Sequence, residues 1–136
     1  MEKYEYLEKK MHNSKFYVCK HCGNIIIKAH DAGVPVECCG EKMHEAAPNT
    51  TDAAKEKHVP AVVKDGSKIT VTVGSTKHPM EEKHFIEWIY LVCENSTQSR
   101  HLHPAEEPVA EFILTGDKPL SVYEYCNLHG LWKADV

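Results

Sequence analysis

The segment AVVKDGSKITVTV, residues 61–73, gives the clearest indication of fold class in this chain. Polar and apolar residues alternate in its second half, which places Ile69, Val71 and Val73 on one face of a β-strand and the threonines between them on the other. An Asp-Gly pair separates this half from the apolar run before it, and glycine readily adopts the positive φ that tight hairpin turns require. The segment therefore predicts a β-hairpin with one buried face.

Further strands are predicted beyond this hairpin, where apolar or aromatic runs are bounded by turn residues. They are FIEWIYLV (85–92), TQSRHLH (97–103), VAEFILT (109–115) and SVYEYC (121–126). No long helical period interrupts them. Several short strands separated by turns predict an all-β fold, an antiparallel sandwich, for the larger part of the chain.

The chain has 136 residues, six cysteines and a net charge of −4, with acidic and basic residues interspersed. Nucleic acid is not an expected partner, because there is no basic stripe to bind a phosphate backbone. No apolar run approaches the roughly 18 residues that a membrane span requires, and we expect no secretory signal. The prediction is therefore a cytoplasmic protein whose cysteines bind metal or take part in catalysis instead of forming disulfides.

The cysteines and histidines divide the chain into two unequal parts. Residues 15–46 hold four cysteines among the short predicted strands FYV, NIIIKA and VPVE, and a segment below roughly 40 residues usually needs a metal or a disulfide to fold. Residues 47–136 contain the predicted sandwich, and the Pro-, Asn- and Thr-containing stretch 45–54 indicates a linker. Residues 1–14 are charged, and we expect a frayed arm or a short surface helix without chemistry. The pattern predicts two domains with separate sites.

The first candidate site consists of Cys19, Cys22, Cys38 and Cys39. A Cys-x-x-Cys-Gly sequence lets two thiolates bind one cation, because the glycine relieves crowding in the turn. The second pair is adjacent, and neighbouring side chains reach one metal only if the backbone between them is distorted. From this spacing, iron, a structural zinc and a redox disulfide all remain open.

The second candidate site combines residues that are far apart in the sequence but lie at the predicted ends of strands. These are His58, His78, His84, Cys126 and His129. A sandwich gathers its loops at such ends, so we expect the five side chains to meet. Imidazole nitrogens and a thiolate suit ferrous iron, and five ligands leave a sixth position open to an anion. The other histidines are interpreted as surface groups, and Cys93 as a buried small hydrophobe.

Five motifs in this order resemble those of desulfoferrodoxin, the two-iron superoxide reductase family. They are CxxCG at 19–23, CC at 38–39, EKHVP at 56–60, HPMEEKHFIEW at 78–88 and CNLHGLWKA at 126–134. The resemblance covers nearly everything from Phe16 to the end, and the adjacent cysteines make it specific. The chain departs from the family in a longer N-terminal arm and in the loop at 101–103, which affects surface contacts and donor docking but no ligand motif.

The resemblance implies two non-heme iron ions per chain. A desulforedoxin-like first domain would hold one iron with the four cysteines, and an immunoglobulin-like sandwich would hold the other with four histidines and Cys126, usually in a homodimer. The sandwich site would reduce superoxide to hydrogen peroxide, with electrons from a rubredoxin-like donor. Glu56 would cap the sixth position of the ferric state, and Lys57 would attract superoxide from a mobile loop. The first iron would relay electrons or only stabilise its domain.

The main alternative is a non-catalytic electron carrier, either blue-copper-like or rubredoxin-like. Blue-copper sites also use a Cys-x-x-His sequence in a sandwich, but no methionine follows His129 as the weak axial ligand. A zinc-ribbon interaction module would explain the first four cysteines, but it would give the later histidines and Cys126 no function. A dismutase releases oxygen as well as peroxide, so stoichiometry separates it from a reductase.

Overall fold

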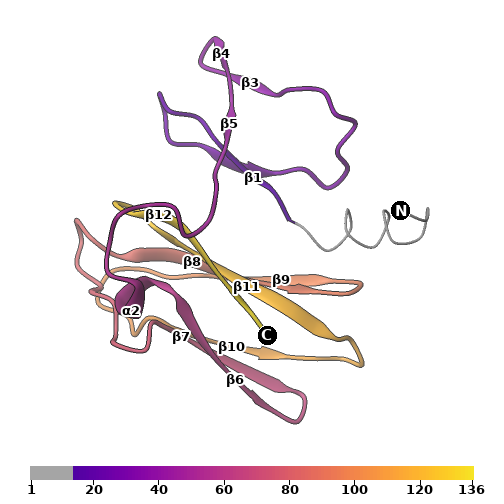
Figure 1. The fold of residues 1–136 in the computed structure, drawn as a ribbon, viewed down its shortest axis with the longest axis vertical. Helices are drawn as coiled ribbons and strands as arrows, with labels where there is room; N and C mark the ends of the chain where they lie inside the picture. Colours follow the sequence, from indigo (N-terminus) through magenta and orange to yellow (C-terminus); the bar gives the residue numbers. More distant parts are fainter. Residues whose placement is uncertain (1–13) are drawn as a thin grey trace. The chain divides into compact units, whose positions relative to one another are not determined.

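The computed structural model describes residues 14–136, whose regular secondary structure is almost entirely β-strand, joined by turns and loops. The chain divides into two compact units, the first ending at Ala47 and the second spanning Pro48–Val136 (Figure 1). The arm predicted for residues 1–14 lies outside the described residues, except for Ser14. In the described part of the chain, no helix has the length and apolar character needed to cross a bilayer.

The first unit consists of very short strands with little core. Its strands are β1 (Phe16–Val18), β2 (Ile25–Ile27), β3 (Glu37–Cys38), β4 (Glu41–Lys42) and β5 (His44–Glu45). β1 lies between β2 and β5, and β3 pairs with β4, all antiparallel. Among the described hydrophobic residues of this unit, only Phe16 and Cys19 are buried. A core this small cannot hold the unit together without a further contribution.

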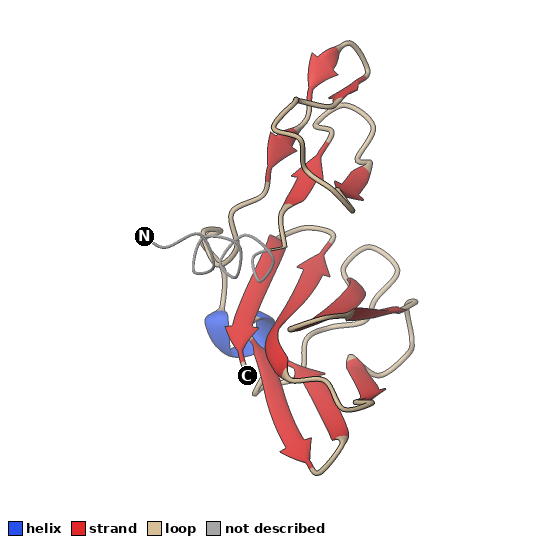
Figure 2. Cartoon of the chain, turned by 90° about the vertical axis from the view of Figure 1, so that its right-hand side faces the viewer, coloured by secondary structure: helices blue, strands red, loops and turns tan. Residues whose placement is uncertain are grey.

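The second unit is a sandwich of two antiparallel sheets, preceded by one short helix (Figure 2). The three-stranded sheet has the order β10-β7-β6, and the four-stranded sheet has the order β12-β11-β8-β9. The elements are α2 (Lys55–His58), β6 (Pro60–Asp65), β7 (Lys68–Val73), β8 (Ile86–Cys93), β9 (Thr97–His101), β10 (Val109–Ile113), β11 (Pro119–Cys126) and β12 (Gly130–Asp135). The predicted all-β sandwich is confirmed.

The predicted hairpin is present as β6 and β7, which pair along their whole length. Gly66 has a φ of +59° in the turn, a conformation that other residues adopt only with strain. Ile69, Val71 and Val73 are fully buried and form one side of the core. The alternation of the sequence therefore identified the buried face correctly.

The core of the sandwich lies between the two sheets. β8 contributes Ile89 and Leu91, β10 contributes Phe112, and all three pack in one cluster with residues of β7 and β11. Cys93 belongs to the same cluster and is 3% exposed, which confirms its interpretation as a buried small hydrophobe. Cys126 is the last core residue of β11, so one candidate ligand is part of the core itself.

The sequence pattern does not predict the last strand, β12. Leu131 and Trp132 are neighbours and are both buried, so they break the period of two that marks a half-buried strand. The strand is held instead by pairing with β11, in which Gly130 lies opposite Cys126. In the first unit the predicted VPVE strand is mostly loop, because only Glu37 belongs to a strand.

Candidate metal centres

The first candidate site is assembled by two tight turns of the first unit. Cys19 and Cys22 flank the turn after β1, and Cys38 and Cys39 lie where β3 turns into β4. Their sulfur atoms all lie within 4.8 Å of one another. Cys39 has a φ of +54°, a left-handed conformation that allows it and Cys38 to face the same point. The backbone distortion that adjacent ligands require is present.

The four thiols influence one another's ionisation. The pKa of Cys19 falls to about 6, chiefly because the backbone N–H of Cys22 donates to its sulfur. The pKa of Cys39 rises to about 12, because its sulfur shares hydrogen bonds with the sulfurs of Cys22 and Cys19 and so opposes a second charge. Four thiolates at this separation need a cation among them, so the group fits a metal ion.

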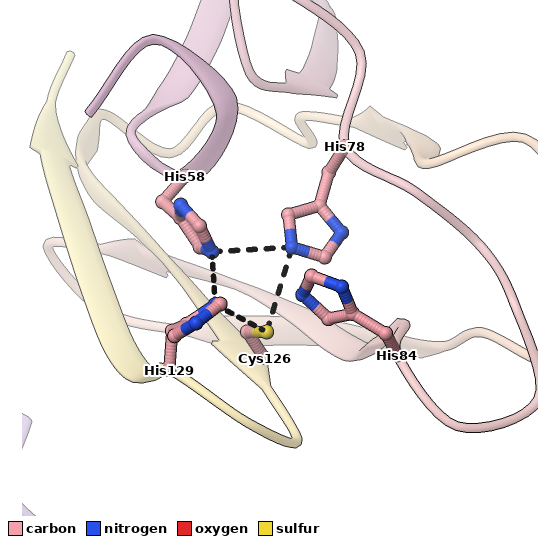
Figure 3. Close-up of side chains that lie close together, drawn as sticks. All are labelled: His58, His78, His84, Cys126 and His129. Carbon is pink, nitrogen blue, oxygen red and sulfur yellow. Dashed lines mark hydrogen bonds between the residues drawn. The ribbon is translucent and has the colours of Figure 1, made fainter. Parts of the chain in front are cut away.

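The second candidate site lies where several loops of the sandwich meet (Figure 3). His58 ends α2, His78 and His84 lie between β7 and β8, Cys126 ends β11, and His129 lies in the turn before β12. One donor atom from each residue lies within 4.8 Å of the others. The structure thus brings together all five side chains that the sequence analysis selected.

The donor atoms face one another at short range. Nε2 of His58 is 3.0 Å from Nδ1 of His129 and 3.2 Å from Nε2 of His78. Sγ of Cys126 is 3.4 Å from Nε2 of His78 and 3.8 Å from Nδ1 of His129. The ring of His84 lies 4.6 Å from that of His78, centroid to centroid. Lone pairs that converge in this way are satisfied by a shared cation.

Burial sets the ionisation of these donors. His58 and His78 are 2% and 3% exposed, whereas His84 and His129 are half-buried. Burial lowers the pKa of His78 to about 4 and also lowers the pKa of His58. Burial raises the pKa of Cys126, although the backbone N–H groups of His129 and Leu128 oppose the rise. The imidazoles of His58 and His78 are therefore neutral at physiological pH, and the thiolate of Cys126 needs a nearby positive charge.

Main-chain carbonyls fix the tautomer of two ligands. Nδ1 of His58 donates to the carbonyl of Ala54 at 2.7 Å, and Nδ1 of His78 donates to the carbonyl of Pro79 at 2.6 Å. Each bond leaves the Nε2 lone pair directed at the centre. The ring of His58 also stacks on Trp132, with centroids 4.8 Å apart and an interplanar angle of 27°. The surrounding protein therefore holds the rings of His58 and His78 in place without a metal.

His84 has a different environment. Its Nε2 atom is buried and has no hydrogen-bond partner among residues 14–136. A buried nitrogen without a partner costs free energy, about 1–3 kcal/mol for a typical polar group. A cation bound by the five donors would satisfy this atom. The second site therefore also fits a metal ion.

Glu56 and Lys57, predicted to act at this site, are exposed residues of α2 immediately before His58. The carbonyl of Glu56 accepts a hydrogen bond of 2.8 Å from the backbone N–H of Thr76. A Cβ atom at Gly74 would lie 2.6 Å from the same carbonyl oxygen, so only glycine permits this approach. Burial is the main cause that lowers the pKa of His84; His129 also lowers it, Glu81 raises it, and Lys57 makes the smallest contribution, which lowers it. The positive charge of Lys57 therefore reaches the half-buried side of the site, but weakly.

Glu124, which the sequence pattern did not single out, is fully buried two residues before Cys126. Both of its carboxyl oxygens lack a hydrogen-bond partner among the described residues, and burial raises its pKa well above the ordinary value. Burial therefore favours the neutral form of this carboxyl group. A glutamate at an inward position of the predicted strand SVYEYC was the signal that could have identified it.

The histidines interpreted as surface groups are exposed wherever the structure describes them, and His12 lies outside the described residues. His21, inside the first cysteine pair, and His44 both contact the carboxylate of Glu41 instead of the cysteine cluster. The first site therefore consists of cysteines alone.

Comparison with known proteins identifies the family. The family described as Desulfoferrodoxin matches residues 50–135. A desulfoferrodoxin of Nitratidesulfovibrio vulgaris is 50% identical over 122 residues, covering 90% of this chain and 96% of its own length. The superoxide reductase structure of Treponema pallidum superposes with a TM-score of 0.76 at 36% identity, covering 90% of this chain and 98% of that one. A superoxide reductase structure of Giardia intestinalis, described as 1Fe-SOR, has a TM-score of 0.53 at 35% identity and covers 60% of this chain and 98% of that one.

The matches to the Nitratidesulfovibrio protein and to the Treponema structure each cover 90% of the chain. The four-cysteine group and the four-histidine, one-cysteine group match the two iron centres of desulfoferrodoxins. Both groups have the donor types and the close convergence that a metal requires. The chain therefore belongs to the desulfoferrodoxin family.

Proposed function

We propose that this chain is a superoxide reductase, which converts superoxide to hydrogen peroxide at the four-histidine, one-cysteine centre. The observation that carries the proposal is the convergence of these five donors in a cluster with a buried side and a half-buried side. The similarity to solved superoxide reductases supports it. A closed four-cysteine cage offers a substrate no open position, so the reaction is assigned to the second centre.

The reaction consumes one superoxide anion, one electron and two protons and gives one molecule of hydrogen peroxide. Iron at this centre would supply the electron by changing from the ferrous to the ferric state. His58 and His78 stay neutral because of burial and so offer nitrogen lone pairs to the metal. The thiolate of the fully buried Cys126 would increase electron density there.

Lys57 is proposed to attract the substrate. Superoxide is an anion, and the chain as a whole carries a net charge of −4, so a local positive group must favour its approach. Lys57 is exposed and lies next to His58, and its charge reaches His84 on the half-buried side. The same ammonium group can hold water that delivers the two protons. Glu56 is proposed to cap the open side of the oxidised centre.

The deciding experiment is a product count. Iron-loaded, reduced protein is mixed rapidly with superoxide without oxygen, and hydrogen peroxide, dioxygen and oxidised iron are measured. A reductase gives one peroxide for each catalytic iron oxidised and no dioxygen. Release of dioxygen would instead show a dismutase, and absence of peroxide would leave a non-catalytic electron carrier.

The contribution of Lys57 is tested by Lys57→Ala, with Lys64→Ala as the matched control. Both residues are exposed lysines of the second unit, but Lys64 lies near the far end of β6, away from α2. Loss of a steering charge should slow superoxide capture about 10-fold and reduce its dependence on ionic strength. Equal rates and salt slopes in the two variants would refute steering by Lys57.

The remaining parts of the proposal concern partners. An external one-electron donor of the rubredoxin type would reduce the oxidised centre, and reduction of the protein by a small iron–sulfur carrier would test this. A homodimer remains a prediction, which a measurement of the molar mass in solution tests. A cytoplasmic location also remains a prediction.

A further inference from the structure

The four histidines of the catalytic centre are not anchored in the same way. His58 and His78 each donate a ring hydrogen bond to a main-chain carbonyl. Among residues 14–136, the ring of His84 makes no such bond to a main-chain carbonyl, and its buried Nε2 atom has no hydrogen-bond partner. His84 is also only half-buried, so its packing restrains it less than the packing of His58 or His78. Its position must come mainly from the main chain that carries it.

The main chain around His84 is held from two sides. A tight turn closes on itself through two hydrogen bonds, from the N–H of Glu81 to the carbonyl of His84 at 2.9 Å and from the N–H of His84 to the carbonyl of Glu81 at 3.0 Å. On the other side, the side chain of Asn127 contacts both neighbours of His84. Its Nδ2 donates to the carbonyl of Lys83 at 2.9 Å, and its Oδ1 accepts from the N–H of Phe85 at 3.0 Å.

Asn127 also pairs through its own backbone, because its N–H donates to the carbonyl of Phe85 at 3.2 Å. It lies directly after Cys126 and two residues before His129, in the turn that joins β11 to β12. One turn therefore carries two ligands and holds the segment of a third. An amide is the side chain that can donate to one main-chain group and accept from another at the same time.

We propose that Asn127 is a positioning residue that sets the place of His84 in the metal centre. It touches neither the metal nor the substrate and acts by bracketing the peptide groups on both sides of this ligand. Groups that orient a metal ligand typically contribute 10–100-fold to metal affinity. The inference rests on the metal centre of the proposed function but not on its reaction. The affinity for iron measures the effect of Asn127 even if the protein turns out not to reduce superoxide.

The test compares Asn127→Ala and Asn127→Gln in the full, iron-loaded chain. The alanine variant loses both side-chain bonds, and we expect ferrous iron at the catalytic centre to be bound about 10–100-fold more weakly in competition with a chelator. The electron paramagnetic resonance signal of the ferric centre should broaden, because the His84 ring takes several orientations. Glutamine keeps the amide on a longer stem, so it should recover part of the affinity. The four-cysteine centre in the same sample should keep its signal.

Asn49→Ala is the matched control for stability. Asn49 also makes two hydrogen bonds to the main chain, both to Lys133, at 3.1 and 2.8 Å, and it borders no ligand. This variant should lower the thermal midpoint of the sandwich and leave iron affinity within about twofold. If Asn127→Ala behaves in the same way, with a lower midpoint but unchanged affinity and spectrum, Asn127 is only a structural residue. Such a result, or a glutamine variant no better than alanine, overturns the positioning role.

Discussion

The two metal centres of this chain depend on the protein in opposite ways. In the first unit, Cys22 and Cys39 are exposed and the ligands lie on two turns that share almost no core. In the second unit, Cys126 is fully buried and belongs to the core cluster of the sandwich. The cysteine site therefore needs its metal to exist as a structure, whereas the histidine site is largely formed by the fold. In the first unit the metal holds the fold together, whereas in the second unit the fold positions the ligands of the metal.

Removal of both metals should produce the largest difference between the two units: one should unfold and the other should stay folded. Apparent binding free energies of structural metals reach about 10–16 kcal/mol, more than a core of two buried residues provides, so the first unit should unfold. The sandwich has its own core and should stay folded. Nuclear magnetic resonance of the metal-free chain measures this: amides of β1 and β2 should lose their dispersion, and those of β7 and β8 should retain it. Persistent dispersion in both units would contradict the comparison.

Loss of one ligand from each centre gives the next largest contrast. Cys126→Ser should lower the rate of superoxide reduction about 100-fold or more, because the site loses its thiolate. Cys19→Ser should remove the first centre and leave peroxide formation with an artificial reductant nearly unchanged. Peroxide yield and iron content are the measurements.

The control for packing is Cys93→Ser, which changes a buried cysteine of the same core without touching a ligand. It should lower stability and keep both irons. Loss of peroxide formation in Cys19→Ser would show that the first centre takes part in the reaction.

Gly74→Ala should have a smaller, local effect on the second centre. The added Cβ would lie 2.6 Å from the carbonyl oxygen of Glu56 and 3.0 Å from that of Lys57, so this segment must shift. We expect superoxide capture to slow about 10-fold while both irons are retained. Gly116→Ala is the control, because it strains a φ of +76° but meets nothing within 4 Å. Equal rates in the two variants would show that the close approach at Gly74 does not affect superoxide capture.

The smallest expected effect concerns acid stability of the sandwich away from either metal. The carboxylate of Asp117 accepts hydrogen bonds from the hydroxyl of Ser96 and from backbone N–H groups, which lower its pKa. A lowered pKa contributes stability above the ordinary value of 3.8, and this contribution is lost as the pH falls through the folded-state pKa. Ser96→Ala should therefore raise the pKa of Asp117, which a titration of its carboxyl chemical shift measures. It should also slightly reduce the free energy of unfolding, but only at pH values above the folded-state pKa of Asp117. An unchanged pKa would rule out this bond as the main cause.

Sequence patterns were sufficient where a feature depends on near neighbours. The alternation of residues 68–73 predicted the buried face of β7, and the motifs predicted every donor that the structure brings together. Patterns failed where distant pairing decides the outcome. β12 has two adjacent buried residues and forms only because β11 lies beside it.

By itself, the sequence determined the donor types, the strand periods and the division into two sites, because these follow from chemistry and spacing over a few residues. Only the tertiary structure decided that His58 and His129, 71 positions apart, place their nitrogens 3.0 Å from each other. It also decided that Asn127 brackets the segment of His84 and that the carboxyl group of Glu124 is buried without a hydrogen-bond partner among residues 14–136. Such contacts arise from the pairing of distant strands and the burial that follows, which no local pattern encodes.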